Sequence, residues 1–498
     1  MRLKGYPEAH SQIVVKAQGL PNEINSDMLS ILVAKAYEVP MEPTGITDVE
    51  LANYVLSHSR QMITYADDAG QWFTWNGKIW EHDQNNSVLE RRVLELLETV
   101  PLHIADPKLA MRAVKRCNSS ATVNSVIKSM RRKVQGIRWK DMDADPFLLN
   151  CQNGVLDLRK PMSFRPARPE DLLSRVTNVA YDPRATCPIF QQFLNQIMLG
   201  DAANVNLLQA MMGYLLLGGA NKERLMFFLV GGGRNGKSTL VRIMMEMMGS
   251  YATSIAIQTL LKGNDHGPRD DLMSLANRRL LTINEMDEED KLSVRTAKAM
   301  TGNDLMKARD LYSTFMDIAV NGLPLISTNG LPNLGDDKTE AIWDRMRILP
   351  FNLRVEKEDD DVDLIDKLLA ELPGILNFAL RGLERYQQDR NALVQETPLM
   401  LKAKNEYRRR FNVVRSYLAS HFDRTDPSQG KTLSVDIIDA FNQWASANNL
   451  AISLTAQKLK KEMMALGIPA NATGGRYYCC LPKPEMDEDD DWNGEESV

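Results

Sequence analysis

Gly231-Gly232-Gly233-Arg234-Asn235-Gly236-Lys237-Ser238-Thr239 directly follows the apolar run 225–230 and directly precedes a helical pattern at 240–245. The order is strand, glycine loop, helix, with G-x-x-x-x-G-K-S at the join. Glycines let backbone N–H groups close around phosphate oxygens, and a helix N-terminus adds a positive dipole end. The stretch therefore predicts ATP binding, with Lys237 neutralising β/γ-phosphate charge and the Ser238 hydroxyl holding Mg²⁺. A plain glycine-rich turn would not explain a lysine at the helix start.

Size and composition indicate a protein of several domains. The chain has 498 residues, which is too long for one compact core. Of these residues 44% are hydrophobic and 25% are charged. No apolar run is long enough for a transmembrane helix, and no signal peptide follows Met1. The five cysteines show neither a C-x-x-C pattern nor metal-ligand spacing. We therefore expect a cytoplasmic protein without membrane contact.

The formal net charge of −5 is unevenly distributed. Residues 485–498 contain eight acids and no lysine or arginine, so the rest of the chain is slightly positive. This acidic tail is expected to be disordered. It serves solubility, or it docks a partner or competes with DNA for a basic channel. A nearly neutral body does not exclude nucleic-acid binding, because a groove can be locally basic.

The expected fold class is α/β, with a P-loop (AAA+-like) ATPase domain, a preceding helical and small mixed domain, and a C-terminal winged-helix-like module. The predicted divisions are an N-terminal extension (1–45), an α+β region with an aromatic hairpin (46–186), a helical collar (187–220), the ATPase core (221–352), a helical region (353–424), the winged-helix-like domain (425–483) and the acidic tail (484–498).

The α+β region contains several local signals. Thr47-Asp48-Val49-Glu50 resembles a capping box before a helix. Residues 71–80 predict two aromatic strands around an Asn-Gly turn. Its three tryptophans are favoured as domain core over a stacking platform for bases. Helical patterns follow at 88–99 and 122–135, the second with a basic face, and two short strands are expected within 148–158.

Beyond the glycine loop, residues 280–285 form an apolar strand that ends in an acid. Glu285 is the candidate that polarises the attacking water, and Asp287 is close enough to help hold the metal. With Ser238 these two acids form the predicted metal site. Asn284 stands where many P-loop proteins place an aspartate. Strand-end acids that are simply solvated are the competing interpretation.

Residues 323–329 form a third apolar strand, which ends in Asn329. An amide beside the γ-phosphate can hydrogen-bond both a phosphate oxygen and the water, so Asn329 is predicted to be a sensor. Arg345 and Arg347 follow on an extended segment. Arginine supplies a permanent planar charge to a transferring phosphoryl group, and Arg345 is preferred over Arg347 for this role. A structural pair with the acids at 358–361 is the alternative.

Residues 301–315 predict a strand, a turn and a return strand. Lys307, Arg309 and Tyr312 would present two cations and one stacking ring to a nucleic-acid strand. A solvated hairpin is the competing interpretation.

The C-terminal part predicts two amphipathic helices, at 435–448 and 455–466, followed by a β-rich ending at 477–481. This order suits a winged-helix module with Gly474-Gly475-Arg476 in the wing. A generic small α+β domain is the alternative.

Taken in order, these motifs resemble superfamily 3 helicases, and among them the phage/plasmid and poxvirus-type primase–helicase family. The resemblance extends from about Thr47 to Leu481 and is carried by G-G-G-R-N-G-K-S-T, T-I-N-E-M-D-E-E, M-T-G-N-D-L-M-K-A-R, I-S-T-N and I-W-D-R-M-R-I-L-P-F. It implies that Lys237 and Ser238 bind ATP and Mg²⁺, that Glu285 activates water and that Asn329 is the sensor. It also implies an arginine finger contributed in trans by Arg345, and a hairpin that faces single-stranded DNA in the pore of a hexamer.

Two departures from the family pattern are visible. Only about 46 residues precede the matching region and they contain no D-x-D-like metal site, so priming activity is not expected. The acidic strand reads Asn-Glu instead of Asp-Glu or Asp-Asp, which bears on direct metal contact.

The resulting hypothesis is an ATP-dependent replicative DNA helicase of a phage, prophage or plasmid-like element. It would act as a homo-hexamer on single-stranded and forked duplex DNA, with a separate primase as a further partner. The alternative is a P-loop ATPase that acts as a regulatory or assembly switch without unwinding. A small-molecule kinase is a third class, in which an arginine supplied in trans has no place.

Overall fold

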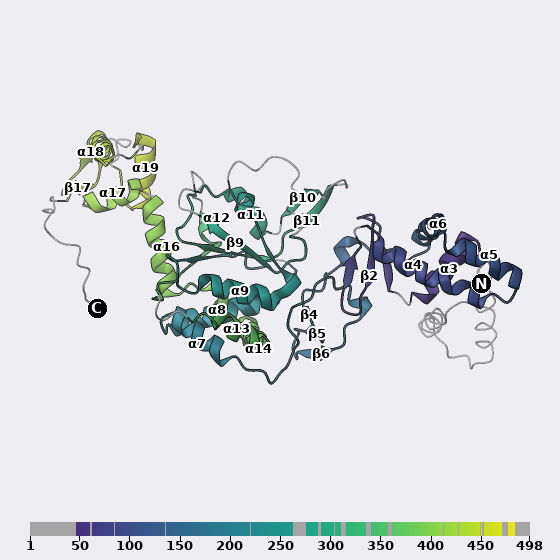
Figure 1. Cartoon of the computed structure of the whole chain (residues 1–498). Helices are drawn as coiled ribbons and strands as arrows, with labels where there is room; N and C mark the ends of the chain where they lie inside the picture. Colours follow the sequence, from purple (N-terminus) through teal and green to yellow (C-terminus); the bar gives the residue numbers. More distant parts are fainter. Residues whose placement is uncertain are drawn as a thin grey trace, which may run out of the picture. The chain divides into compact units, whose positions relative to one another are not determined.

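A computed structural model of the chain describes residues 46–483 with internal gaps (Figure 1). The gaps are 60–61, 84, 135, 220, 262–274, 287–289, 303, 310–314, 335–339, 357–360, 412, 427, 449, 451–452 and 471–476. At 285, 305–309, 315–319 and 409–411 only the backbone is described. The described residues form two compact units. The first contains residues through Met346 together with Phe351–Gln395, and the second contains Arg347–Pro350 together with the residues from Glu396 onward.

The first unit begins with a helical layer and a small antiparallel sheet. Its elements are α3 (Asp48–His58), β1 (Ile63–Ala66), β2 (Gln71–Trp75), β3 (Trp80–His82), α4 (Ser87–Thr99), α5 (Pro107–Cys117) and α6 (Ser120–Arg131), with a 3₁₀ turn, η1 (Val100–His103), after α4.

The predicted capping box is confirmed at the start of α3. The Glu50 amide donates to Thr47 Oγ1 at 3.3 Å, and the Thr47 amide donates to Glu50 Oε2 at 3.0 Å. Two N–H groups that a helix start leaves unpaired are thereby satisfied.

The aromatic hairpin is also confirmed, with Trp75 opposite Trp80 across β2 and β3. Trp72 and Trp80 are each only 4% exposed. Trp72 meets the ring of Tyr65 edge-on at 5.0 Å, inside the core that α3, α4 and α6 share with β1. These two tryptophans are core residues, as the sequence favoured, whereas Trp75 is only partly buried.

A second small sheet follows, made of β4 (Leu148–Cys151), β5 (Gly154–Asp157) and β6 (Ser163–Arg165), between two 3₁₀ turns, η2 (Trp139–Asp141) and η3 (Pro169–Asp171). Cys151 pairs with Gly154, which confirms two strands around an Asn-Gly turn.

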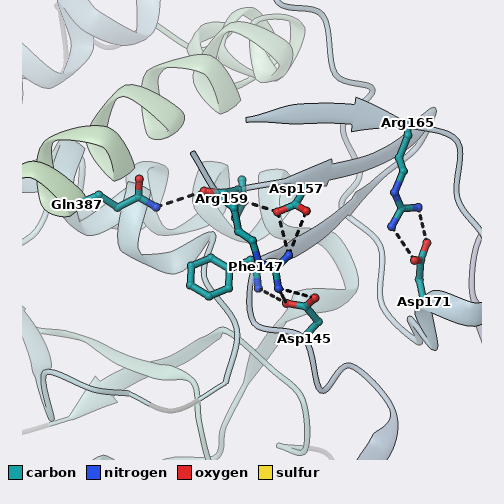
Figure 2. A network of polar contacts seen from close by, with 8 residues as sticks. Asp145, Phe147, Asp157, Arg159, Arg165, Asp171 and Gln387 are labelled. Atoms are coloured by element: carbon teal, nitrogen blue, oxygen red, sulfur yellow. Dashed lines mark hydrogen bonds and ion pairs between the residues drawn. The ribbon is translucent and has the colours of Figure 1, made fainter. Parts of the chain in front are cut away.

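Arg159 joins the segment before β4 to the end of β5, as Figure 2 shows. Its guanidinium donates to both oxygens of Asp145 at 2.7 Å and to both oxygens of Asp157 at 3.0 Å, above the Phe147 ring. Gln387 donates to the carbonyl of the neighbouring Leu158 at 3.3 Å, so a distant helix is attached to the same strand end. Hydrogen bonds to these two carboxylates satisfy most of the N–H donors of the Arg159 guanidinium.

The small sheet is connected to the centre of the unit through Tyr251. The Asn150 amide donates to the Tyr251 hydroxyl at 3.2 Å, and Arg279 lies over the Tyr251 ring while donating to the Leu148 carbonyl at 2.6 Å. Complete burial raises the pKa of Tyr251 to about 12, so the hydroxyl stays neutral and accepts this bond at physiological pH.

The next part of the chain contains a five-stranded sheet with helices, all in the first unit except residues Arg347–Pro350 of β13. In chain order the elements are α7 (Pro188–Ile197), α8 (Ala202–Leu215), β7 (Met226–Val230), α9 (Lys237–Met248), β8 (Ala252–Ser254), β9 (Leu280–Met286), α11 (Val294–Gly302), β10 (Leu305–Arg309), β11 (Phe315–Ala319), β12 (Leu323–Thr328), α12 (Glu340–Trp343), β13 (Met346–Pro350), α13 (Leu364–Ala370), α14 (Leu372–Gln388) and α15 (Asn391–Val394), with 3₁₀ turns η4 (Gly249–Tyr251) and η5 (Ile257–Thr259).

The strand order is β13-β7-β12-β9-β8, and β12 runs parallel to both β7 and β9. All six residues of β12 are buried, as expected of a parallel strand covered on both faces. Figure 1 shows α8, α9 and α14 on one side of β9, and α11 and α12 on the other. The predicted α/β class is therefore confirmed, and the structure adds that strands of its sheet are parallel.

Helices α8 and α14 cross at two glycines. A Cβ added to Gly213 would lie 2.0 Å from the Leu383 nitrogen, and one added to Gly382 would lie 1.8 Å from the Gln209 carbonyl oxygen. Only glycine permits the two backbones to approach so closely. The crossing holds the helical layer next to α9, which α14 also contacts.

Outside the main sheet, β10 and β11 form an antiparallel hairpin, with Leu305 opposite Ala319 and Arg309 opposite Phe315. A hairpin is confirmed, but with other bounds than the predicted 301–315. Thr301 and Gly302 end α11, and the return strand extends from Phe315 to Ala319. The predicted turn falls on 310–314, which lie outside the described residues.

The second unit consists of α16 (Pro398–Phe411), α17 (Val413–His421), β14 (Phe422–Arg424), β15 (Thr432–Leu433), α18 (Ser434–Ala447), α19 (Ala456–Ala465), β16 (Tyr477–Tyr478) and β17 (Cys480–Pro482). Tyr417 packs edge-on against Phe441 in a core that includes Leu459 and Met463. Two helices followed by short strands is the predicted order, and the proposed wing at 474–476 lies outside the described residues. Of the helices described in either unit, none has the length and apolar character of a membrane span.

Gly213→Ala tests the crossing of α8 and α14. Alanine favours an ordinary helix interior by about 1 kcal/mol over glycine. Because an added methyl group meets backbone here, we expect the free energy of unfolding to fall by about 1–3 kcal/mol instead. Denaturant unfolding followed by circular dichroism measures the change. An increase in stability would show that the two helices do not meet at this glycine.

Candidate functional site

The glycine loop between β7 and α9 turns through residues with positive φ. Gly233 has φ +78°, Arg234 has φ +48° and Gly236 has φ +83°. The Gly231 amide donates to the Thr328 carbonyl at 3.2 Å, which attaches the start of the loop to the end of β12. A Cβ on Gly236 would lie 2.4 Å from Cγ2 of Ile197 on α7, so this position requires glycine for both its backbone angle and its packing.

Lys237 is the first residue of α9 and is only 4% exposed. Its ammonium group contacts the Gly231 carbonyl oxygen and lies 3.2 Å from Asn235 Oδ1. Burial lowers the pKa of Lys237, because a desolvated ammonium group is disfavoured. A charged donor held by neutral oxygens at a helix N-terminus is well placed to receive an anion.

An open cavity of about 850 Å³ lies in front of this lysine. The glycine loop from Gly233 to Gly236 forms one wall of the cavity, α9 as far as Glu246 a second, and the ends of β9 and β12 a third. The other lining residues are Val241, Arg242, Met245, Glu246, Asn284, Met286, Ser327, Thr328 and Asn329. Its volume is in the range of sites for cofactor-sized ligands.

Several residues predicted from separate motifs meet in this cavity. Lys237, Ser238 and Thr239 line it from α9, and Asn329 lines it from the loop after β12. Glu285 is placed by its backbone in β9, between Asn284 and Met286, both of which line the cavity. The second predicted metal-holding acid, Asp287, lies outside the described residues, while Gly231 and Gly232 are not among the lining residues.

Arg345 does not line the cavity. Its guanidinium donates to the Lys298 carbonyl at 2.7 Å and to Thr301 Oγ1 at 2.8 Å, both near the end of α11. Burial, followed by the charge of Arg224, lowers the pKa of Arg345. Within its own subunit, therefore, this arginine is attached to the helix that leads into the β10–β11 hairpin. Arg347 lies on β13 and is buried.

The predicted DNA-contacting residues can be placed only in part. Lys307 and Arg309 both belong to β10, where the structure describes the backbone, and Tyr312 lies outside the described residues. Lys307 and Arg309 are two residues apart on one strand, so they share a face.

The sequence analysis did not predict that Arg242, Glu246 and Thr328 line the cavity. Each has a side chain that can bind a ligand. Helical spacing could have identified the first two, because Ser238, Arg242 and Glu246 follow one another at steps of four on one face of α9. Thr328 was visible in the Ser-Thr-Asn motif. Its hydroxyl contacts the carbonyl oxygens of Met286 and Gly330, so it joins the ends of β9 and β12 beside the cavity.

Comparison with known proteins finds two family models and several viral relatives. Residues 52–199 match the family described as D5 N terminal like, and residues 229–346 match a family of unknown function, DUF5906. The protein named "Putative helicase L207/L206" of Acanthamoeba polyphaga mimivirus is 22% identical over 401 residues, covering 76% of this chain and 41% of the viral protein. "Putative helicase 121R" of Invertebrate iridescent virus 3 is 24% identical over 370 residues, covering 67% of this chain and 38% of its own.

"Putative primase C962R" of African swine fever virus (isolate Tick/Malawi/Lil 20-1/1983) is 20% identical over 479 residues, covering 88% of this chain and 49% of that protein. This chain is similar to proteins of the phage and viral primase–helicase family. It spans about half the length of these relatives or less. A similar fold is seen in the A-form apo structure of the NrS-1 C-terminal region, with a TM-score of 0.53, 13% identity, and coverage of 84% of this chain and 95% of that one.

Gly236→Ala tests the geometry of the glycine loop. A side chain there must adopt φ +83° and displace Ile197, so we expect a loss of about 1–3 kcal/mol in the free energy of unfolding. Gly232→Ala is the matched control in the same loop, because a Cβ at Gly232 meets nothing within 4 Å. Thermal unfolding of both variants decides the matter, and equal stability of the two would contradict the described loop.

Proposed function

We propose that this chain is an ATP-dependent DNA helicase of the superfamily 3 type, which hydrolyses ATP at subunit interfaces of a hexameric ring and moves along single-stranded DNA. The observation that carries the proposal is Lys237 at the N-terminus of α9, facing a cavity that the ends of β9 and β12 also line. The family relationship supports it, since relatives that share the glycine-loop region bear helicase names.

The first step of the proposal is nucleotide binding. A triphosphate in the cavity would take the Lys237 ammonium from the two neutral oxygens that hold it, and would accept loop N–H groups at the start of α9. The cavity presents hydroxyl and amide oxygens from Ser238, Thr239 and Asn284, which are hard donors that suit Mg²⁺. Ser238, Glu285 and Asp287 would hold the ion, which neutralises phosphate charge when bound.

The second step is hydrolysis. Glu285 accepts a proton from water as the water oxygen attacks the γ-phosphorus and the bond to the β–γ bridging oxygen breaks. Asn329, at the cavity edge, hydrogen-bonds the γ-phosphate oxygen or the water and distinguishes ATP from ADP. Neither role requires a residue from outside the β9 and β12 ends.

The third step couples hydrolysis to DNA. Arg345 of one subunit is proposed to reach the ATP of its neighbour, and to do so it must leave Lys298 and Thr301 at the end of α11. Because α11 continues into the β10–β11 hairpin, release of this contact would alter the hairpin's support. Lys307, Arg309 and Tyr312 would contact the strand in the pore, with 3′ to 5′ movement as the resemblance implies. The C-terminal unit would add contacts to forked duplex DNA, and a separate primase remains a proposed partner.

A regulatory or assembly switch without unwinding is the second candidate. It shares the nucleotide site, so the cavity does not separate the two. Unwinding of forked DNA by the wild-type protein does, since a switch would bind ATP and assemble without separating strands.

Two substitutions test the catalytic roles. Lys237→Ala is expected to abolish ATP binding and unwinding, because the buried cation is lost. Glu285→Gln is expected to retain ATP binding but to lower ATPase activity about 10²-fold or more, since a general base typically contributes that much. Nucleotide binding, phosphate release and fork unwinding are measured in parallel, with Glu90→Gln on α4 as an acid-to-amide control. Unwinding by both variants at the wild-type rate would disprove the proposal.

Mixed rings test the role of Arg345. Arg345→Ala and Lys237→Ala are each expected to be inactive alone. If Arg345 acts in trans, random mixing restores a complete site at about one interface in four, because each interface pairs different surfaces of two subunits. Phosphate release from mixed and unmixed samples measures this. No recovery on mixing would assign Arg345 to its own subunit, where it supports α11, and the same experiment with Arg347→Ala examines the second arginine.

A further inference from the structure

A group of positive charges lies outside the nucleotide cavity, on α5, α6 and the residues directly after α6. Residues 101–134 contain eight lysines and arginines and a single acid, Asp106. The basic residues are Lys108, Arg112, Lys115, Arg116, Lys128, Arg131, Arg132 and Lys133, all exposed. The chain without its acidic tail has only a slightly positive net charge. The net positive charge of residues 101–134 alone is larger than that value.

The single acid does not neutralise the surface. The Asp106 carboxylate accepts the Lys108 amide at 2.9 Å and caps the start of α5. A helix surface that merely needs solubility usually mixes charges of both signs at neighbouring positions. Here no acid follows within either helix, so the positive potential is unopposed along both.

Three of the basic residues hold the two helices in place. Arg116 forms an ion pair with Asp48 on α3 at 2.5 Å, and Lys133 donates to Asn53 on the same helix at 2.6 Å. The Arg131 guanidinium lies 4.6 Å from the centre of the Tyr65 ring. The other five (Lys108, Arg112, Lys115, Lys128 and Arg132) make no ion pair within the described part of the chain.

On α5 these cations form a stripe. Lys108, Arg112 and Lys115 follow at steps of four and three and therefore lie on one helical face, opposite the buried Ala113 and Cys117. The stripe spans about 10 Å along the helix axis, enough to reach more than one phosphate. Met111, which is 78% exposed, lies within it.

The two helices form a hairpin whose connection is only Asn118 and Ser119. In Figure 1, α5 and α6 are next to each other among the helices of the N-terminal layer. Exposed Asn118, Ser120 and Asn124 add neutral hydrogen-bonding groups beside the cations. Side chains of this kind commonly contact phosphate oxygens.

From these observations we infer that the α5–α6 surface binds the phosphate backbone of double-stranded DNA without sequence preference. Cations supply backbone affinity for any nucleic acid. Non-specific single-strand sites add aromatic rings on which bases stack, but residues 101–134 contain no phenylalanine, tyrosine or tryptophan. The surface is separate from the proposed motor, since none of these residues lines the nucleotide cavity or belongs to β10 and β11.

The test neutralises three cations that take no part in holding the helices: Arg112→Gln, Lys115→Gln and Arg132→Gln in one full-length protein. Binding of a mixed-sequence duplex is measured without nucleotide across a range of salt concentrations. We expect Kd to rise about tenfold or more at low salt, and the slope of log Kd against log salt to fall by about two to three, as expected for three lost phosphate contacts.

The matched control neutralises three other exposed cations, Arg91, Lys140 and Arg184, to glutamine. On α4, Arg91 is next to Glu90 and four residues before Glu95, so its charge is already balanced. Circular dichroism and thermal unfolding establish that both triple variants are folded. We expect the control to bind duplex with the wild-type slope.

Two results would overturn the inference. If the test variant binds duplex as the control does, the surface serves solubility or an acidic protein and not DNA. If the test variant loses affinity for a single strand of equal charge but not for duplex, the surface binds single-stranded DNA. Because no nucleotide is present, Lys237→Ala should bind duplex normally, so failure of the helicase proposal would leave this measurement interpretable.

Discussion

Backbone pairing of β12 with β7 on one side and β9 on the other brings the parts of the site together. Thr328 pairs with Val230, directly before the glycine loop, and Ser327 pairs with Asn284, directly before Glu285. Parallel strands end at the same edge of a sheet, so three motifs that are far apart in sequence meet there. The Thr328 hydroxyl and the Gly231 amide add contacts across the same strand ends. A change in register of a single residue would turn these side chains away from the cavity.

The chain uses positive charge in two physically different settings. Lys237 is buried at a helix start, where desolvation lowers its pKa and makes a bound anion the most favourable partner for its ammonium group. The lysines and arginines of α5 and α6 are exposed and keep their hydration, so their effect is summed over a surface and depends on salt. A buried cation selects a ligand by shape and contact, whereas an exposed group of cations attracts any polyanion.

Local patterns in the sequence were good predictors where the deciding interactions are local. The capping box at Thr47, the turns at Asn76-Gly77 and Asn153-Gly154, and the β10–β11 hairpin depend on residues within a few positions of one another. The sequence favoured burial of Trp72 and Trp80 but could not establish it. A hairpin with tryptophans has the same sequence pattern whether or not helices cover it. The contact of Arg345 with Lys298 and Thr301 could not be predicted, because no sequence pattern links β13 to the end of α11.

By itself, the sequence determined that a strand, a glycine loop and a helix follow one another at 225–245, since the positive φ values at Gly233 and Gly236 and the helix start at Lys237 are short-range requirements. It also determined, to within one residue, where two further strands end, since β9 ends one residue after Glu285 and β12 ends one residue before Asn329. Only the tertiary structure decided that Arg242, Glu246 and Thr328 share the cavity with them, and that α8 and α14 touch at Gly213 and Gly382. The physical reason is that strand order and helix crossing are set by long-range packing, in which many weak contacts act together and no single residue pattern records the partner.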